Sequence, residues 1–453
     1  MKNSILIING LLLTMEQEMP LVEDGAIFIK DGIIVDCGTS REIAKRHGRV
    51  ETVIDAESHI IMPGLVNCHT HLPMSMFRGL ADDLPLDVWL NEHIFPAEAA
   101  MLNPDSVKKW ALHSCMEMLL AGITTCCDGY FYEDQVAEAV MASGMRAVLG
   151  QGVIDFPAPG VPEPAKNIDV AEDFVRKWKS FSSTNKSYVQ DAGHSRIQDA
   201  GYSRVVPSVF CHSPYTCSRE TLIKAKEMAK RLGVLFQIHV AETREEMNMV
   251  RRINSSISGD ESRDMSVVQY LDSAGILDDK TLLVHAVWIN DADMEIIKSR
   301  SAKVAHCPES NMKLASGIAP AWKLVQENIS VGLGTDGCAS NNTHDLFSEM
   351  DMAAKLQKTA LMDPCAMDAR SVVEMATIGG ARAIGLGHIT GSIVPGKKAD
   401  IIVVGLRKPH MVPVYNPWST VVYGAKASDV RVVMVDGTIL VKDGKFLNPD
   451  FHD

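Results

Sequence analysis

Three short segments, far apart in the chain, contain residues that could bind a metal ion and move protons. They are His69-Thr70-His71, His239 with Glu242 in "HVAE", and Asp336 in "GTDG". Together they offer three imidazoles and a carboxylate as metal ligands, and a second carboxylate for proton transfer. Such a set suits one bound metal ion that activates water, so the pattern predicts a metal-dependent hydrolase or deaminase.

The spacing of these residues indicates how they could meet. His69 and His71 are two positions apart, so on a strand both side chains project to the same face. Some barrel hydrolases bridge two metals with a carboxylated lysine on the fourth strand. Here the fourth predicted strand ends in "FCHSPY", which places His212 in that region and offers no lysine. The sequence therefore favours a single metal, and ligands of this kind suit either Zn²⁺ or Fe²⁺.

Eight apolar, strand-like runs alternate with helix-like stretches through the middle of the chain. The runs lie at 62–67, 122–129, 146–153, 204–212, 234–242, 281–286, 302–308 and 330–337. Alternation of this kind predicts a parallel sheet, and eight units predict an α/β fold of the (β/α)₈ TIM-barrel type. Nearly all of the candidate site residues lie at the carboxyl ends of the predicted strands, where the active sites of such barrels are built.

The two ends of the chain have a different character, with short β-type runs in place of alternating units. Asp31-Gly32 and Asp436-Gly437 each separate two apolar runs, which is typical of tight β-hairpins. We therefore expect residues 1–61 and 392–453 to form one small, discontinuous β-sandwich domain. Residues 62–391 would form the metal-dependent barrel.

Length and charge restrict the class of protein. The 453 residues are enough for a large core and a smaller unit, and the net charge of -13 argues against nucleic acid or an anionic membrane as a partner. The apolar start is broken by Asn9 and Gly10 and no cleavage site follows, so we expect a strand, a turn and a second strand there. No apolar run approaches the ~20 residues of a membrane span, and we expect a cytoplasmic protein.

The ten cysteines contain no C-x-x-C pair, and Cys126 and Cys127 are adjacent within an apolar run. Neighbouring positions on a strand face opposite ways, so we expect buried, reduced thiols.

Residues 190–205 contain a near-tandem repeat, "QDAGHSRI" followed by "QDAGYSRV". Two units are too few for a repeat architecture. We interpret the segment as a surface insertion, with a lid or a subunit contact as the alternative.

Motifs along almost the whole chain resemble those of the amidohydrolase superfamily, and within it the 5-methylthioadenosine/S-adenosylhomocysteine deaminases. They include "MPGLVNCHTHLPMSMFRGLADDLPLDVWLNEHIFPAEA", "CHSPYTCS", "IHVAET", "HCPESNMKLASGIAP", "GLGTDGCASNN" and "GSIVPGKKADIIVV". These motifs specify the superfamily strongly and the substrate less strongly, because s-triazine hydrolases and guanine-type deaminases share several of them.

The resemblance implies the ligands of one divalent metal ion. The matching residues are His69, His71, His239 and Asp336. We expect Zn²⁺, with Fe²⁺ as the alternative.

The resemblance also implies the residues that contact the substrate. Glu242 matches the acid/base residue at the heterocycle, and His285 matches a histidine beside the attacked carbon. Glu98 in "FPAEA" matches a carboxylate that binds ribose hydroxyls, and His212 matches a substrate-contacting histidine. Asp336 would also contact the substrate and take the proton of the attacking water. For His306 two roles are possible: a structural residue of the barrel, or a residue that supports the site from behind.

One departure from the family's pattern bears on the substrate. Members that act well on S-adenosylhomocysteine are expected to hold its carboxylate with arginines. Here Gln151 stands at one such position, and Lys166 is the only cation in the segment "DFPAPGVPEPAKNIDV" that follows. Glutamine cannot form a charged, bidentate clamp. We expect Gln151 to line the substrate site, and 5'-methylthioadenosine or adenosine to be preferred, with ammonia and an inosine-type product released.

Two other functions stay as alternatives. The first is an s-triazine, guanine or pterin-type amidohydrolase, and the second is a non-catalytic scaffold on the same fold. The complete set of metal ligands argues against the scaffold, and Glu98 favours a substrate with ribose hydroxyls. We further expect a homo-oligomer that binds only a small-molecule substrate.

Overall fold

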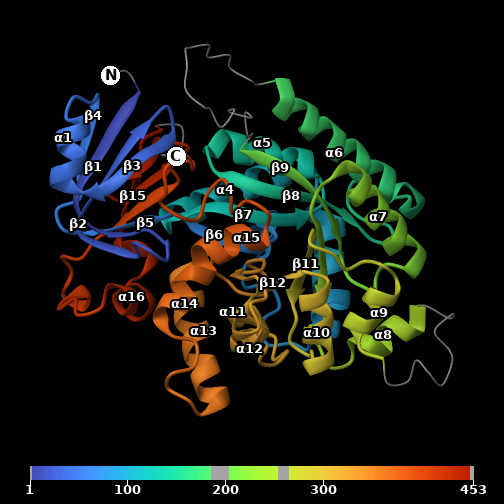
Figure 1. Ribbon diagram of the computed structural model, residues 1–453. Helices are drawn as coiled ribbons and strands as arrows, with labels where there is room; N and C mark the ends of the chain where they lie inside the picture. The colour runs from blue at the N-terminus through green and yellow to red at the C-terminus, as the bar shows by residue number, and fades with distance from the viewer. Residues whose placement is uncertain (1–2, 185–203, 254–264, 449–453) are drawn as a thin grey trace.

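The computed structural model describes residues 3–184, 204–253 and 265–448, so residues 190–203 of the tandem repeat lie outside it. Two β-sheets organise this part of the chain (Figure 1). One is an eight-stranded parallel sheet in the middle of the sequence, and the other is a nine-stranded mixed sheet made from both ends.

The parallel sheet confirms all eight predicted strands. They are β6 (Leu65–Thr70), β7 (Ile123–Tyr130), β8 (Arg146–Val153), β9 (Val205–Cys211), β10 (Phe236–Val240), β11 (Thr281–His285), β12 (Lys303–His306) and β13 (Val331–Leu333). Neighbours in sequence are neighbours in the sheet, in the order β6 to β13. This is the topology of a (β/α)₈ barrel, as the sequence predicted.

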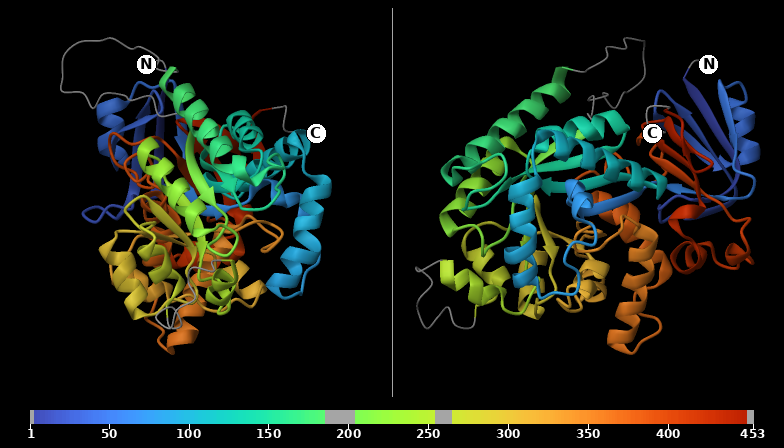
Figure 2. Two further views of the ribbon diagram at one scale, coloured as in Figure 1. Left: turned by 90° about the vertical axis from the view of Figure 1, so that its right-hand side faces the viewer. Right: turned by 180° about the vertical axis from the view of Figure 1, so that it is seen from behind.

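Helices surround the barrel on its outer side (Figures 1 and 2). The longer ones are α4 (Pro104–Leu120), α5 (Glu133–Ser143), α6 (Asn167–Thr184), α7 (Arg219–Leu232), α8 (Glu246–Ile253), α9 (Val267–Ser273), α10 (Asp291–Ser299) and α13 (Leu346–Leu361). Shorter ones are α11 (Pro308–Lys313), α12 (Ala321–Gln326), α14 (Ala369–Glu374) and α15 (Gly380–Ala383). α7 ends at Gly233, which caps the helix with φ of 68°.

The barrel closes where its first and last strands meet. The backbone N–H of Asp336 donates to the carbonyl of His69 at 3.0 Å, and the side chain of Asn67 donates to Thr335 at 2.8 Å. Gly332 permits this approach, because an added Cβ would lie 2.2 Å from the sulfur of Cys68. Closure places the metal-capable residues of β6 beside Asp336.

The terminal strands meet in one sheet, as the sequence predicted. Its members are β1 (Ser4–Leu13), β2 (Leu21–Lys30), β3 (Ile33–Thr39), β4 (Thr52–Asp55), β5 (Ile60–Pro63), β14 (Ile401–Val404), β15 (Val430–Val435), β16 (Thr438–Lys442) and β17 (Lys445–Phe446). By its hydrogen bonds this β-rich unit is one continuous mixed sheet, with β14 from the C-terminal part beside β5 from the N-terminal part. It lies at one side of the barrel (Figures 1 and 2).

Both predicted hairpin turns are confirmed, and they contact each other. Asp31, Gly32, Asp436 and Gly437 all have positive φ, as the two-residue turn requires. A Cβ on Gly32 would lie 2.5 Å from the carbonyl oxygen of Asp436, and one on Gly437 would lie 2.6 Å from Cα of Gly32. Glycine at both positions therefore lets the two ends of the chain pack together.

A buried ion pair connects the barrel to this sheet. Arg146, the first residue of β8, donates to both carboxylate oxygens of Asp400, at 2.8 and 3.1 Å, and both side chains are fully buried. Asp400 also accepts from the backbone N–H of Asp436 at 2.7 Å. The two units are thus joined by a fixed polar contact as well as by apolar packing.

Shorter segments complete the chain. They are α1 (Ser40–His47), α2 (Leu86–Val88), α3 (Phe95–Met101), α16 (Pro417–Ser419), the π-helical turns η2 (Trp89–Ile94), η6 (Met375–Gly379) and η8 (Thr420–Gly424), and the 3₁₀ turns η1 (Leu72–Phe77), η3 (Pro164–Lys166), η7 (Pro409–Met411) and η9 (Ala427–Asp429).

Some details differ from the sequence predictions. The start of the chain is one strand, β1, because Asn9 takes a positive φ of 59° and the register shifts around Gly10 without a turn. All ten cysteines are free, and eight are buried, but Cys37 is half-buried and Cys365 is exposed. Cys126 and Cys127 pack into different core clusters, as expected. No helix among the described residues has the length and apolar character to cross a membrane.

Candidate active site

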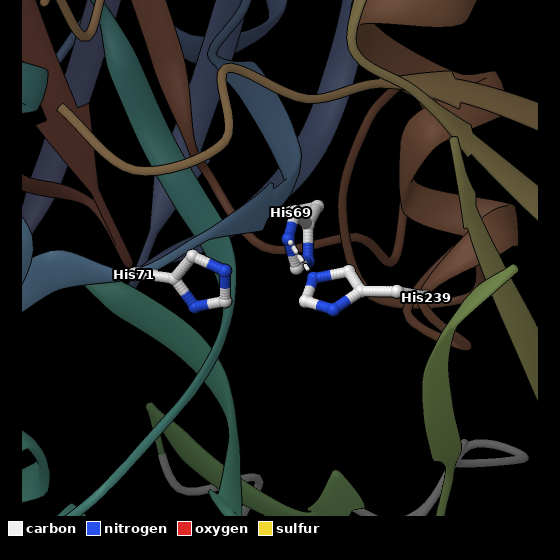
Figure 3. Close-up of side chains that lie close together, drawn as sticks. All are labelled: His69, His71 and His239. Atoms are coloured by element: carbon white, nitrogen blue, oxygen red, sulfur yellow. Dashed lines mark hydrogen bonds between the residues drawn. The ribbon is translucent and has the colours of Figure 1, made fainter. Parts of the chain in front are cut away.

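One pocket brings together most of the residues that the sequence singled out. His71, His239, Glu242, His285 and Asp336 line it, at or just beyond the carboxyl ends of β6, β10, β11 and β13. His69 lies fully buried beneath it. Figure 3 shows the imidazoles of His69, His71 and His239 gathered around one small region.

The distances in this cluster fit a metal site. Nε2 of His69 lies 3.1 Å from Nε2 of His239, and Oδ1 of Asp336 lies 3.4 and 3.3 Å from Nε2 of His69 and His71. Two ligands on one tetrahedral zinc ion, each at about 2.0–2.1 Å, are about 3.3 Å apart. These three separations are compatible with ligands of a single ion, and the ligand atoms of the three histidines all lie within 4.8 Å of one another.

The protonation of the cluster also fits. Burial lowers the pKa of His69 to about 4 and holds the pKa of His239 well below its usual range, so both rings are neutral and keep a lone pair. His71 donates its Nδ1 proton to the carbonyl of Gly129 at 2.6 Å, which leaves Nε2 free toward Asp336. Metal-binding histidines are commonly oriented by such a bond on the other ring nitrogen.

Asp336 is held from three sides. Its backbone has φ of 62°, an unfavourable conformation for a residue with a side chain. Oδ2 accepts from the hydroxyls of Ser310 and Ser340 at 2.7 and 2.8 Å, and Oδ1 accepts from the backbone of Gly337 at 2.8 Å. Burial acts to raise the pKa of Asp336, but its interactions with His69 and the other histidines outweigh it and keep the pKa well below its usual value.

Glu242 stands at a turn built by a second carboxylate. Glu246, on α8, accepts from the backbone N–H groups of Ala241 and Glu242 at 2.9 and 2.8 Å, and Ala241 has φ of 52°. Oε2 of Glu242 thereby lies 3.8 Å from Nε2 of His285. Burial raises the pKa of Glu242, which makes its carboxyl easier to protonate.

The outer part of the pocket has a polar side and an apolar wall. Glu98, on α3, is buried and accepts a hydrogen bond from the hydroxyl of Tyr130, and burial raises the pKa of Glu98 to about 7. The ring of His212 lies 6.2 Å from that of Phe95. The wall is made largely by residues of and around the π-helical turn before α3, namely Leu86, Trp89, Leu90, Ile94 and Phe95. Such π-helical turns are common at functional sites.

Two residues that the sequence singled out do not line this pocket. Gln151 points away from it, because its side-chain oxygen accepts from the backbone of Glu133 at 3.2 Å and the residue lines a separate cavity beside α5 and α6. His306 is fully buried, and neither ring nitrogen has a hydrogen-bond partner among the described residues. Conversely, sequence reasoning did not single out Ser310 or Ser340, although both lie within quoted motifs.

These features define a class of protein: (β/α)₈ barrels with histidines and carboxylates gathered at the carboxyl ends of the strands. A match to the amidohydrolase family spans residues 60–440, and the chain belongs to that family. This confirms the resemblance that the motifs indicated. The family generally binds a divalent metal ion, in agreement with the histidine cluster.

Relatives of similar length carry more specific names. The chain is 41% identical over 443 residues to a 5-methylthioadenosine/S-adenosylhomocysteine deaminase of Syntrophobacter fumaroxidans, covering 98% of this chain and 94% of the relative. It is 42% identical over 448 residues to a 5'-deoxyadenosine deaminase of Methanosarcina acetivorans, with coverage of 98% and 94%.

Among solved structures, a zinc-bound adenosine deaminase from Xanthomonas campestris superimposes with a TM-score of 0.87 at 32% identity, covering 98% of this chain and 94% of the other. An atrazine chlorohydrolase from Arthrobacter aurescens has a TM-score of 0.83 at 22% identity, with coverage of 98% and 96%, and shares the fold.

Proposed function

We propose that the protein hydrolytically deaminates an adenosine-type nucleoside with one bound divalent metal ion. The observation that carries this proposal is the meeting, at one pocket, of three histidines whose ligand atoms lie within 4.8 Å of one another with the buried carboxyl groups of Asp336, Glu242 and Glu98. The names of the full-length relatives, which are deaminases of 5'-substituted adenosines, support it.

The residues that would hold the ion are His69, His71, His239 and Asp336. We propose Zn²⁺, with Fe²⁺ as the alternative, and a single ion because none of the described residues that line the pocket is a lysine. When bound, the metal lowers the pKa of water from about 15.7 toward 7 and so supplies hydroxide at neutral pH.

The remaining residues have distinct tasks in the reaction. Water adds at C6 of the purine while N1 gains a proton, the amino group takes up the proton that the water lost, and the C6–N bond breaks to release ammonia. Loss of the remaining hydroxyl proton then leaves the inosine-type product. Glu242 would deliver the proton to N1 from its carboxyl, whose pKa is raised by burial. His285 would face the carbon under attack and Asp336 would accept the proton of the water. Glu98 and His212 would orient the nucleoside.

Glu98 distinguishes a nucleoside from a bare heterocycle such as a guanine-, pterin- or s-triazine-type substrate. We expect Glu98→Gln to lower kcat/KM for 5'-methylthioadenosine by about five- to a hundredfold, since a buried polar group left without its partner costs about 1–3 kcal/mol. Steady-state kinetics of ammonia release measure this effect. Glu92→Gln, on the exposed side of the neighbouring turn, is the control and should be unchanged. A normal kcat/KM for Glu98→Gln would favour a bare-base substrate.

The wall of the pocket predicts which 5' substituent is preferred. None of the described residues that line the pocket is a lysine or an arginine, and Lys166 is paired with Glu163 at 2.9 Å and is largely exposed. Phe156, from the proline-rich 156–164 loop, packs edge-to-face against Phe95, with the ring centroids 5.5 Å apart. An apolar wall suits a methylthio, deoxy or hydroxyl group and provides no partner for a carboxylate.

We therefore expect a higher kcat/KM for 5'-methylthioadenosine, 5'-deoxyadenosine or adenosine than for S-adenosylhomocysteine. Because a charged tail without a partner is costly, the difference should be about tenfold or more. Ammonia release from a panel of the four nucleosides checks both the reaction and this preference. A highest kcat/KM for S-adenosylhomocysteine would overturn the preference, and no release from any of the four would overturn the function.

Three further expectations stay as proposals. We propose that residues 62–391 form the catalytic barrel and that residues 1–61 and 392–453 form a supporting domain. We also propose a homo-oligomer, which light scattering of the purified protein would test, and a cytoplasmic location.

A further inference from the structure

One short helix contacts two residues of the site at once. α11 begins at Pro308, two residues after the end of β12, and its adjacent residues Ser310 and Asn311 make these contacts. The hydroxyl of Ser310 donates to Oδ2 of Asp336 at 2.7 Å, and the side-chain oxygen of Asn311 lies 2.9 Å from Nδ1 of His285. The helix therefore links residues at the ends of β11 and β13.

The contact between Asn311 and His285 fixes where the imidazole carries its proton. Both side chains are buried, with 1% of each residue exposed. An amide oxygen only accepts, so Nδ1 of His285 must donate, and a neutral ring then has no proton on Nε2. Nε2 is the nitrogen that faces the pocket, 3.8 Å from Oε2 of Glu242.

The backbone around His285 is in an unfavourable conformation. His285 has φ of 73° and Ala286 has φ of 48°, two consecutive left-handed conformations that residues with side chains adopt rarely. Such conformations persist where surrounding contacts hold them. The hydrogen bond from the ring to α11 is one contact of that kind.

The other tautomer would disturb Glu242. A proton on Nε2 would direct an N–H toward the Glu242 carboxyl, and a hydrogen bond to the ionised form of a carboxyl favours that form. Glu242 would then lose the proton that deamination requires it to deliver. An unprotonated Nε2 gives no such stabilisation to the ionised carboxyl and offers a lone pair to the pocket.

We propose that Asn311 is a positioning residue that holds His285 as the Nδ1-protonated imidazole, with the lone pair of Nε2 facing the reacting atoms beside Glu242. The inference deepens the proposed function and rests on it for the role of His285. The position of the proton itself can be measured without any activity.

Two substitutions of similar size separate this role from packing. Asn311→Leu removes the acceptor and keeps an apolar side chain, whereas Asn311→Asp keeps an acceptor oxygen and adds a buried charge. If Asn311 only filled space, leucine would be tolerated better than aspartate, because a buried charge is costly. If it positions His285, aspartate should retain more activity than leucine. Met312→Leu, on the exposed side of the same helix, is the control.

The test uses two measurements. Nitrogen-15 NMR of labelled histidines locates the proton, and the His285 signal is assigned from its absence in His285→Asn. Steady-state kinetics give kcat and KM for 5'-methylthioadenosine. We expect a proton on Nδ1 in the unaltered protein, loss of that preference in Asn311→Leu, and a fall in its kcat of about ten- to a hundredfold with little change in KM. Asn311→Asp should retain the proton on Nδ1 and a higher kcat than Asn311→Leu.

A proton on Nε2 in the unaltered protein would overturn the inference, as would a normal kcat in Asn311→Leu or an Asn311→Asp variant less active than Asn311→Leu. If Asn311→Leu does not fold, the inference is still tested by the tautomer of His285 in the unaltered protein and in Asn311→Asp. Absence of ammonia release by the unaltered protein would contradict the proposed function and leave the NMR result to decide the position of the proton.

Discussion

Replacing His239 by alanine is expected to remove the metal ion and nearly all activity. His239 supplies a neutral ring whose Nε2 lies 3.1 Å from that of His69, so its loss removes one of the proposed metal ligands. Because a metal contributes several kcal/mol to the stabilisation of the transition state, we expect kcat/KM to fall by at least about a thousandfold. Metal content and ammonia release, measured on the same sample, test this expectation.

A surface histidine provides the control. His113, on α4, is exposed, and its ring packs against that of Trp110 with the centroids 5.3 Å apart. His113→Ala should keep about one metal ion per chain and full activity. If His239→Ala also kept a full complement of metal, the ligand set proposed above would be incorrect.

Replacing Glu242 by glutamine should have the second largest effect, and should leave the metal in place. Glutamine keeps the shape of the side chain but cannot deliver a proton to the ring nitrogen. The contribution of a positioned general acid is about 10²–10⁴-fold, so we expect kcat to fall by that factor. Unlike His239→Ala, this variant should bind one metal ion per chain, since Glu242 is not among the proposed ligands.

Glu245 provides a matched control for this variant. It lies on the same turn and is exposed, so Glu245→Gln should be as active as the unaltered protein. Equal kcat values for Glu242→Gln and the unaltered protein would exclude Glu242 as the proton donor. A loss of metal in Glu242→Gln would instead assign it to the ligand set.

The sequence predicted the barrel because its signals are local. Each strand is an apolar run followed by a helical stretch, and each hairpin turn carries an Asp-Gly pair whose φ values the structure confirms. The site residues could be identified for the same reason, since His69, His239 and Asp336 directly follow or end such runs. Glu98 could be named only through the resemblance, because a glutamate on a helix carries no signal of burial.

Other features depend on contacts that a single sequence does not encode locally. Gln151 was expected in the pocket, yet strand alternation and its bond to Glu133 turn it toward the helices. Ser310 and Asn311 reach Asp336 and His285 because a six-residue helix packs across two strand ends, which follows from tertiary packing. The positive φ values of His285 and Asp336 could not be predicted, because neither residue is a glycine.

The most direct test of metal-dependent deamination is ammonia release from 5'-methylthioadenosine by one protein preparation in three states: as purified, stripped of metal by a chelator, and reloaded with Zn²⁺. We predict that stripping abolishes release and that reloading restores it at about one ion per chain. Unchanged release from fully stripped protein would contradict the proposed reaction.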